Sequence, residues 1–114
     1  MTVSGISRLL RARALTDGEA ERAVESCMVC DVLSMALAGG RRNMAWITVR
    51  SSMNALAVAC MTGASCLIFP RGVEPEQAVT DRAKEERIAI LAADMSAFEI
   101  AGILYAAGLR GEVK

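Results

Sequence analysis

Apolar and polar residues follow one another along the chain in blocks that predict helices and short strands in turn. Near the start, apolar residues recur at helical spacing from Val3 to Leu10, and either Thr2 or Ser4 can cap the first turn. This pattern predicts an amphipathic helix over residues 3–12. A turn at Thr16-Asp17-Gly18 and a polar link follow it.

The remaining blocks alternate between strand-like and helix-like runs. Four short apolar runs predict strands, at Val24–Val29, Met44–Val49, Cys66–Phe69 and Ile88–Leu91. Four further segments predict helices, at Asp31–Ala38, Ala55–Met61, Glu74–Glu86 and Ala97–Ala107. The expected caps of the last helix are Asp94 or Ser96, and Pro75 is expected in the first turn of the third of these helices.

Strands that alternate with helices are typical of a parallel sheet covered on both faces. We therefore expect an α/β fold, a three-layer α/β/α domain with a mostly parallel sheet of about four or five strands. The 114 residues are enough for one core and too few for two, so residues 1–114 are expected to form a single domain.

Candidate binding residues stand where the first three predicted strands end, and the loop Ala92–Ser96 follows the fourth. The candidates are Asp31 and Ser34, then Thr48 and Asn54, then Arg71 and Gly72. Right-handed crossovers would bring these strand ends to one edge of the sheet, where α/β domains bind small ligands. Taken singly, Asp31 and Asn54 are expected as helix caps, Thr48 as an ordinary strand residue and Arg71 as a solvated loop charge. Only their convergence predicts a binding site.

Charge and composition exclude several partners. The 13 Lys and Arg residues balance the 13 Asp and Glu residues, which does not favour nucleic acid or an anionic membrane as a partner. The longest apolar stretch, residues 55–70, is interrupted by polar residues and falls short of a membrane span. Arginines interrupt the apolar positions of the N-terminus, unlike the core of a signal peptide. We expect a cytoplasmic protein.

The four cysteines have two interpretations. Cys27 and Cys30 form a C-x-x-C, which allows a metal or redox role, with Cys60 and Cys66 as the remaining thiols. A second C-x-x-C is missing and the chain has no histidine. We therefore favour the interpretation that the cysteines are small buried residues, and we expect no cofactor. A metal site formed by Cys27 and Cys30 is the weaker alternative. The lack of histidine also excludes His-dependent acid–base catalysis by this chain.

Four motifs in a fixed order resemble the DRTGG domain over residues 2–109. They are Cys30-Asp31-Val32-Leu33-Ser34, Trp46-Ile47-Thr48, Asn54 with Ala57-Val58-Ala59, and Ser96-Ala97-Phe98-Glu99 with Tyr105. The resemblance implies an α/β regulatory module of the kind found in CBS-domain pyrophosphatases and near the N-terminus of HPr kinase/phosphorylase. It implies dimer contacts, and for stand-alone copies an association with iron-only hydrogenase components. It brings no catalytic residues.

The chain departs from the family pattern at three places. Pro70-Arg71-Gly72 replaces the Thr-Gly-Gly that often follows the third strand, so either Arg71 takes over the anion contact or the site is lost. Ser52 stands where the family commonly has a histidine, and the C-x-x-C cysteines replace small residues.

These observations lead to three functional hypotheses. The first is a non-enzymatic regulatory or ligand-sensing module that forms a homodimer and binds a nucleotide or a similar anion at the strand ends. The second is an accessory protein that docks to an iron-only hydrogenase or another redox complex, since seven methionines favour an adhesive face. The third, a small enzyme, is the least favoured, because no nucleophile and base can be paired.

Overall fold

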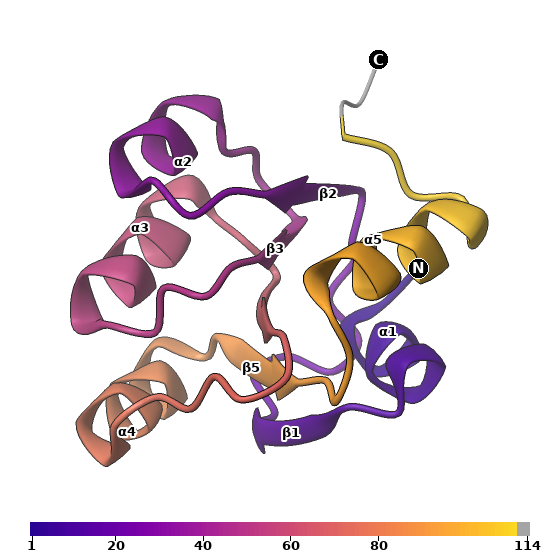
Figure 1. The fold of residues 1–114 in the computed structure, drawn as a ribbon. Coiled ribbons are helices and arrows are strands. Elements are labelled where there is room, and N and C mark those ends of the chain that lie inside the picture. Colours follow the sequence, from indigo (N-terminus) through magenta and orange to yellow (C-terminus); the bar gives the residue numbers. More distant parts are fainter. Residues whose placement is uncertain (112–114) are drawn as a thin grey trace.

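The computed structural model describes residues 1–111, which fold into five helices and five strands (Figure 1). The helices are α1 (Val3–Leu10), α2 (Leu33–Gly39), α3 (Met53–Thr62), α4 (Gln77–Glu86) and α5 (Ala97–Ala106). The strands are β1 (Arg13–Thr16), β2 (Ser26–Val29), β3 (Met44–Ile47), β4 (Cys66–Phe69) and β5 (Ala89–Ala92).

The strands form one sheet in the order β1-β5-β4-β3-β2. Strands β2 to β5 are parallel neighbours, and β1 pairs antiparallel with β5. Helices α2, α3 and α4 cover one face, while α1 and α5 cover the other (Figure 1). The predicted three-layer α/β fold with a mostly parallel sheet is confirmed.

The sheet separates two apolar clusters, because successive side chains of a strand point to opposite faces. In β3, Ala45 and Ile47 join the cluster under α1 and α5, and Met44 and Trp46 join the cluster under α2, α3 and α4. The Trp46 side chain is fully buried, and its indole N–H donates to the Cys30 carbonyl at 2.8 Å. Every residue of β3 and β4 is buried, as continuous apolar runs predict.

Three helices begin at a hydroxyl side chain that accepts a backbone N–H. Thr2 accepts from Gly5 in α1, Ser52 from Ala55 in α3, and Ser96 from Glu99 in α5. The structure thus selects Thr2 and Ser96 from the two pairs of expected caps. Such caps typically contribute about 1 kcal/mol each.

Helix α4 begins at Gln77, so the expected start at Glu74 is wrong. A residue that precedes a proline is disfavoured in the helical conformation, and Glu74 precedes Pro75. Residues 73–76 lie outside regular structure, and Glu76, the residue before the helix, has an extended backbone. This leaves the Glu74 side chain on the loop at the sheet edge.

The sequence pattern does not predict β1, because residues 13–15 fall between the expected helix and the expected turn, and Thr16 belongs to that turn. Local pattern alone does not reveal it, since burial along Arg13–Thr16 runs from exposed to buried without alternation. The strand is held by tertiary contacts. The buried Thr16 hydroxyl donates to the Ile88 carbonyl at 2.5 Å and accepts from the Ile90 N–H at 2.8 Å, at a register shift in the β1–β5 ladder.

We predict that Thr16→Val lowers the free energy of unfolding by about 1–3 kcal/mol, because it leaves a buried carbonyl and a buried N–H without their partner. Urea denaturation measures the change. Thr80→Val on α4 is the matched control, since Thr80 is only half-buried and its hydroxyl bonds to no group within residues 1–111. Equal losses in both variants would contradict the role given to Thr16.

Candidate functional site

The carboxyl ends of β2, β3, β4 and β5 lie on one edge of the sheet, because these strands are parallel. Strand β1 runs the opposite way, and Arg13 at its start pairs in register with Ala92 at the end of β5. The antiparallel strand thus brings its first residues to the same edge. Sequence reasoning missed Arg11 and Arg13 as site residues because it missed this strand.

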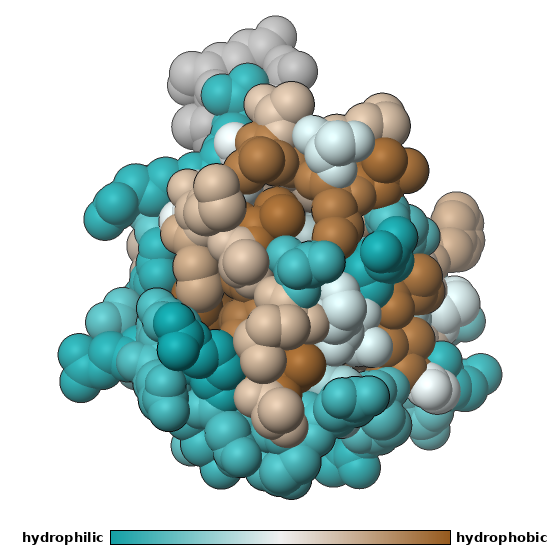
Figure 2. All heavy atoms as spheres, turned by 90° about the vertical axis from the view of Figure 1, so that its left-hand side faces the viewer, coloured by the Kyte–Doolittle hydropathy of each residue, from teal (hydrophilic) through white to brown (hydrophobic). Residues whose placement is uncertain are grey.

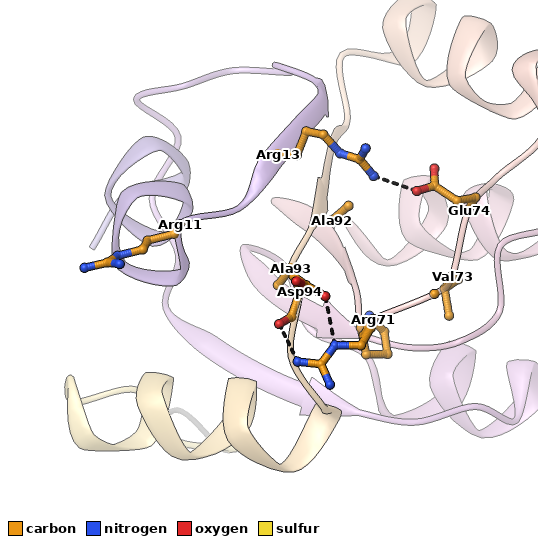
Figure 3. Close-up of a pocket in the computed structure, with 10 residues that line it drawn as sticks. Arg11, Arg13, Arg71, Val73, Glu74, Ala92, Ala93 and Asp94 are labelled. Carbon is orange, nitrogen blue, oxygen red and sulfur yellow. Dashed lines mark hydrogen bonds and ion pairs between the residues drawn. The ribbon is translucent and has the colours of Figure 1, made fainter.

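The loops at this edge diverge at one place, between β4 and β5. The helices that follow β2, β3 and β4 all cover the same face, whereas α5, which follows β5, covers the opposite face. In open α/β sheets, such a switch point leaves a crevice in which ligands bind. An open pocket of about 390 Å³ lies there, between the loop that starts at Pro70 and the loop after β5 that contains Asp94 (Figure 3).

Arg71 closes one side of this pocket by bridging the two loops. Its Nε donates to Asp94 Oδ1 at 2.8 Å, its Nη2 donates to the Asp94 carbonyl at 2.8 Å, and its backbone N–H donates to the Met95 carbonyl at 3.0 Å. The side chains of Arg71 and Asp94 are 66% and 91% exposed. An ion pair so open to water contributes little to stability, so the guanidinium is able to exchange its carboxylate for another anion.

A second ion pair crosses the pocket from β1. Arg13 Nη2 donates to Glu74 Oε1 at 2.6 Å, and both side chains are exposed. Arg11 stands at the rim, where it ends α1 with a left-handed backbone (φ 52°), and its side chain points away from the other charges (Figure 3). Arg13 and Arg71 are each paired with a carboxylate at the pocket, and Arg11 at the rim is the third arginine among the lining residues.

Gly72 shapes the loop beside Arg71. Its φ of +85° lies in the left-handed region that side chains rarely adopt, and the space around it is open. The Val73 N–H donates to the Pro70 carbonyl at 3.2 Å, which closes the turn. The loop that replaces Thr-Gly-Gly is therefore a tight turn that presents Arg71 to the pocket.

Asp31 does not cap the helix after it, so that expectation is wrong. Helix α2 begins at Leu33, preceded by Val32, and no side chain caps it. The Asp31 carboxylate instead accepts from the Thr48 hydroxyl and from the Val49 N–H, each at 2.9 Å. It therefore ties the end of β2 to the end of β3, and the buried Thr48 is part of this link rather than an ordinary strand residue.

Asn54 is not a cap either, because Ser52 fills that position. Asn54 and Ser34 are exposed second residues of α3 and α2. Within residues 1–111, no hydrogen bond links either side chain to the pocket at the switch point. The structure thus separates the six expected residues into three pairs. Arg71 and Gly72 lie at the pocket, and Asp31 and Thr48 contact each other at the ends of β2 and β3. Ser34 and Asn54 belong to neither group.

The two cysteines of the C-x-x-C pack on opposite faces of the sheet. Cys27 contacts the cluster under α1 and α5, and Cys30 contacts the cluster under α2, α3 and α4. Three positions along an extended strand reverse the side-chain direction, so the two thiols do not face a common site. Between residues 1 and 111, no group of three or more Cys, Asp or Glu side chains is arranged to hold a metal ion.

Burial keeps two of the thiols protonated. It raises the pKa of the Cys27 thiol to about 11, and it raises the pKa of the fully buried Cys66 thiol, which lies near Cys27, to about 12. Burial also raises the pKa of the Cys60 thiol, and the nearby Glu86 carboxylate adds to that rise. These shifts fit packing, because a thiol reacts and binds metal as the thiolate.

Comparison with solved structures gives a neighbour with a similar fold. The chain is similar to the CBS and DRTGG domains of the regulatory region of Clostridium perfringens pyrophosphatase, a structure complexed with the activator diadenosine tetraphosphate. The TM-score is 0.70 and the identity 15%, over 90% of this chain and 45% of that chain. The likeness supports a DRTGG-like domain, which confirms the resemblance at the level of the fold.

The chain spans less than half of that structure's length. Neither the known protein families nor the curated proteins give a match to the sequence. No helix among residues 1–111 has the length and apolar character needed to cross a membrane.

We predict that Asp31→Ala lowers the free energy of unfolding by about 1 kcal/mol, because two hydrogen bonds at a solvent-exposed carboxylate are lost. Asp31→Asn keeps an acceptor oxygen at the same position and is expected to retain most of the stability. Thermal and urea denaturation of both variants, with Ser34→Ala as a control, measure the difference. Equal losses in the two Asp31 variants would point to the charge rather than to the hydrogen bonds.

We predict that iodoacetamide at pH 8 modifies Cys30 in the native protein and leaves Cys27 and Cys66 unmodified. With its pKa at about 11, the Cys27 thiol is about 0.1% thiolate at this pH, and the Cys66 thiol is fully buried, whereas Cys30 is partly open to solvent. Peptide mass spectrometry identifies the modified residues, with urea-unfolded protein as the control. A Cys27–Cys30 disulfide formed under a mild oxidant would contradict this arrangement.

Proposed function

We propose that the chain is a non-enzymatic regulatory module that self-associates and binds a nucleotide or a similar phosphate-bearing anion at the pocket between β4 and β5. The observation that carries the proposal is the convergence of exposed guanidinium groups at the switch point of the sheet, where Arg71 and Arg13 are held by exposed carboxylates. The proposed contacts do not include Asp31, Ser34, Thr48 and Asn54. The loops after β2 and β3 lead to helices on the same face of the sheet, so no crevice opens between them.

The chemistry of the pocket suits a phosphate group. A guanidinium binds phosphate through two parallel hydrogen bonds, which are stronger than those between neutral groups. Arg71 already uses its Nε and Nη2 on Asp94, where one bond goes to the carboxylate and the other to the backbone carbonyl, and a phosphate would accept from both N–H donors with two of its oxygens. Because the ion pair is exposed, its replacement by a ligand costs little.

The walls of the pocket suit the rest of a nucleotide. Val73, Ala92 and Ala93 form an apolar side, against which a sugar or a base can pack. A volume of about 390 Å³ falls within the range of small-molecule sites. The structural neighbour is a regulatory region solved with a dinucleotide activator, which supports the same class of ligand for this chain.

The second hypothesis, an accessory protein of an iron-only hydrogenase or another redox complex, stays a prediction from the sequence. The thiols of Cys27 and Cys30 point to opposite faces, which does not favour the version of it that uses the C-x-x-C. We therefore expect any redox partner to bind by surface contact alone.

We predict that a nucleotide raises the thermal stability of the protein, by the equivalent of about 2.7 kcal/mol at a concentration 100-fold above its dissociation constant. The panel contains AMP, ATP and diadenosine tetraphosphate, with adenosine and inorganic phosphate to separate the base from the charge. Differential scanning fluorimetry screens the panel, and calorimetry measures the affinity. The absence of any shift would contradict the proposal.

Variants of the same assay locate the site. Arg71→Ala and Arg13→Ala are expected to weaken binding at least about tenfold each, because each removes a charge-assisted contact. Arg41→Ala is the matched control, since Arg41 is exposed and lies between α2 and β3, at the opposite edge of the sheet. A loss caused by Arg41→Ala as large as that caused by Arg71→Ala would place the ligand elsewhere.

A further inference from the structure

Two neighbouring helices, α2 and α3, contain no charged residue. Large apolar side chains nevertheless remain exposed on this side: Val32 and Leu37 in or next to α2, Met53 in α3, and above all Met35 and Met61, which are 64% and 70% exposed. Figure 2 views this side of the molecule and shows apolar residues gathered over its upper and middle parts, with hydrophilic residues below. An apolar patch of this kind marks an interaction surface.

The same side contains a groove next to a ridge. The groove, of about 450 Å³, lies between α3 and α4, and its α3 side is lined by Met53, Leu56, Ala57 and Cys60. The ion pair between Arg82 and Glu86 of α4, at 3.0 Å, borders it. The ridge is α2, with Met35 at its most exposed point, and it packs against α3 on the side away from α4.

The lack of charge on this face restricts the kind of occupant. A partner that covers an uncharged apolar face must itself present few charges there, since burying an unpaired charge is costly. A second copy of the chain meets this condition, because it presents the same uncharged face. The net charge of zero also creates no overall repulsion between copies. The ridge and the groove lie side by side on one face, so two copies related by a twofold axis can each place the ridge in the groove of the other.

We propose that the α2–α3 face is the homodimer interface, with α2 of one copy seated in the α3–α4 groove of the other. This inference rests on the self-association that we propose above and specifies the surface that carries it. The pocket between β4 and β5 stays open in this dimer, because it lies at the sheet edge and shares no lining residue with the groove.

Sedimentation velocity at micromolar concentrations tests the interface with two matched variants. Met35→Glu places a charge on the ridge and is expected to weaken the dimer at least about 100-fold. Phe98→Glu places the same charge on α5, on the opposite face, at a side chain that is 86% exposed, and is expected to leave the dimer intact. Both sites are exposed, so circular dichroism and thermal denaturation should show little change in the fold.

The outcomes separate the two proposals. A monomeric wild-type protein would overturn self-association and the interface together. A wild-type dimer that persists in Met35→Glu would overturn the interface alone, and its loss in Phe98→Glu would assign the contact to α5. If the Met35→Glu monomer binds nucleotide, the proposed ligand site is supported independently of which face forms the dimer.

Discussion

The direction in which the chain crosses the sheet determines which face each helix covers and where the pocket lies. Each connection from β2 to β5 moves one strand further in the same direction, and right-handed crossovers then place α2, α3 and α4 on one face. The other face of β3 and β4 carries apolar side chains such as Ile47 and Ile68, which α1 alone does not cover. Helix α5 completes that cover, so the chain must change face after β5, and the crevice between β4 and β5 follows from that change.

The pocket at this crevice combines a fixed backbone with exchangeable charges. The turn at Gly72 and the Arg71 N–H bond to Met95 hold the loop in place, while the Arg71 side chain is open to water. A buried ion pair would resist exchange, because the carboxylate left behind would lose both its partner and its solvent. The exposed Asp94 and Glu74 carboxylates would return to water if the proposed anion replaced them. This is the arrangement that a reversible sensor needs.

Much of the fold could be predicted from the sequence, because its local patterns agree with the final structure. The strands around Trp46 and Ile68 are continuous apolar runs, and Thr2 and Ser96 are hydroxyl residues placed before helical spacing. The edge strand at Arg13 was missed because its order comes from the hydrogen bonds of Thr16 with residues more than 70 positions away.

The candidate site was predicted only in outline for a related reason. A sequence shows that Asp31 follows a strand, but it does not show whether its carboxylate turns to the next helix or to the next strand. In the structure the neighbouring strand end offers the Thr48 hydroxyl and the Val49 N–H together, and two partners outcompete a helix cap. Likewise, the four strand ends look equivalent in the sequence, and only the side on which α5 packs distinguishes the crevice beside Arg71.

The pocket and the apolar face are separate surfaces that are connected along the chain through α4 and the segment before it. Glu74, the partner of Arg13, lies three residues before α4 begins, and Arg82 and Glu86 of the same helix border the groove. A ligand influences dimerisation only if it binds the dimer and the monomer with different affinities, and dimerisation then changes ligand affinity by the same factor. Release of Glu74 from Arg13 is the contact change nearest to α4 that could create such a difference, because it frees the segment that leads into the helix.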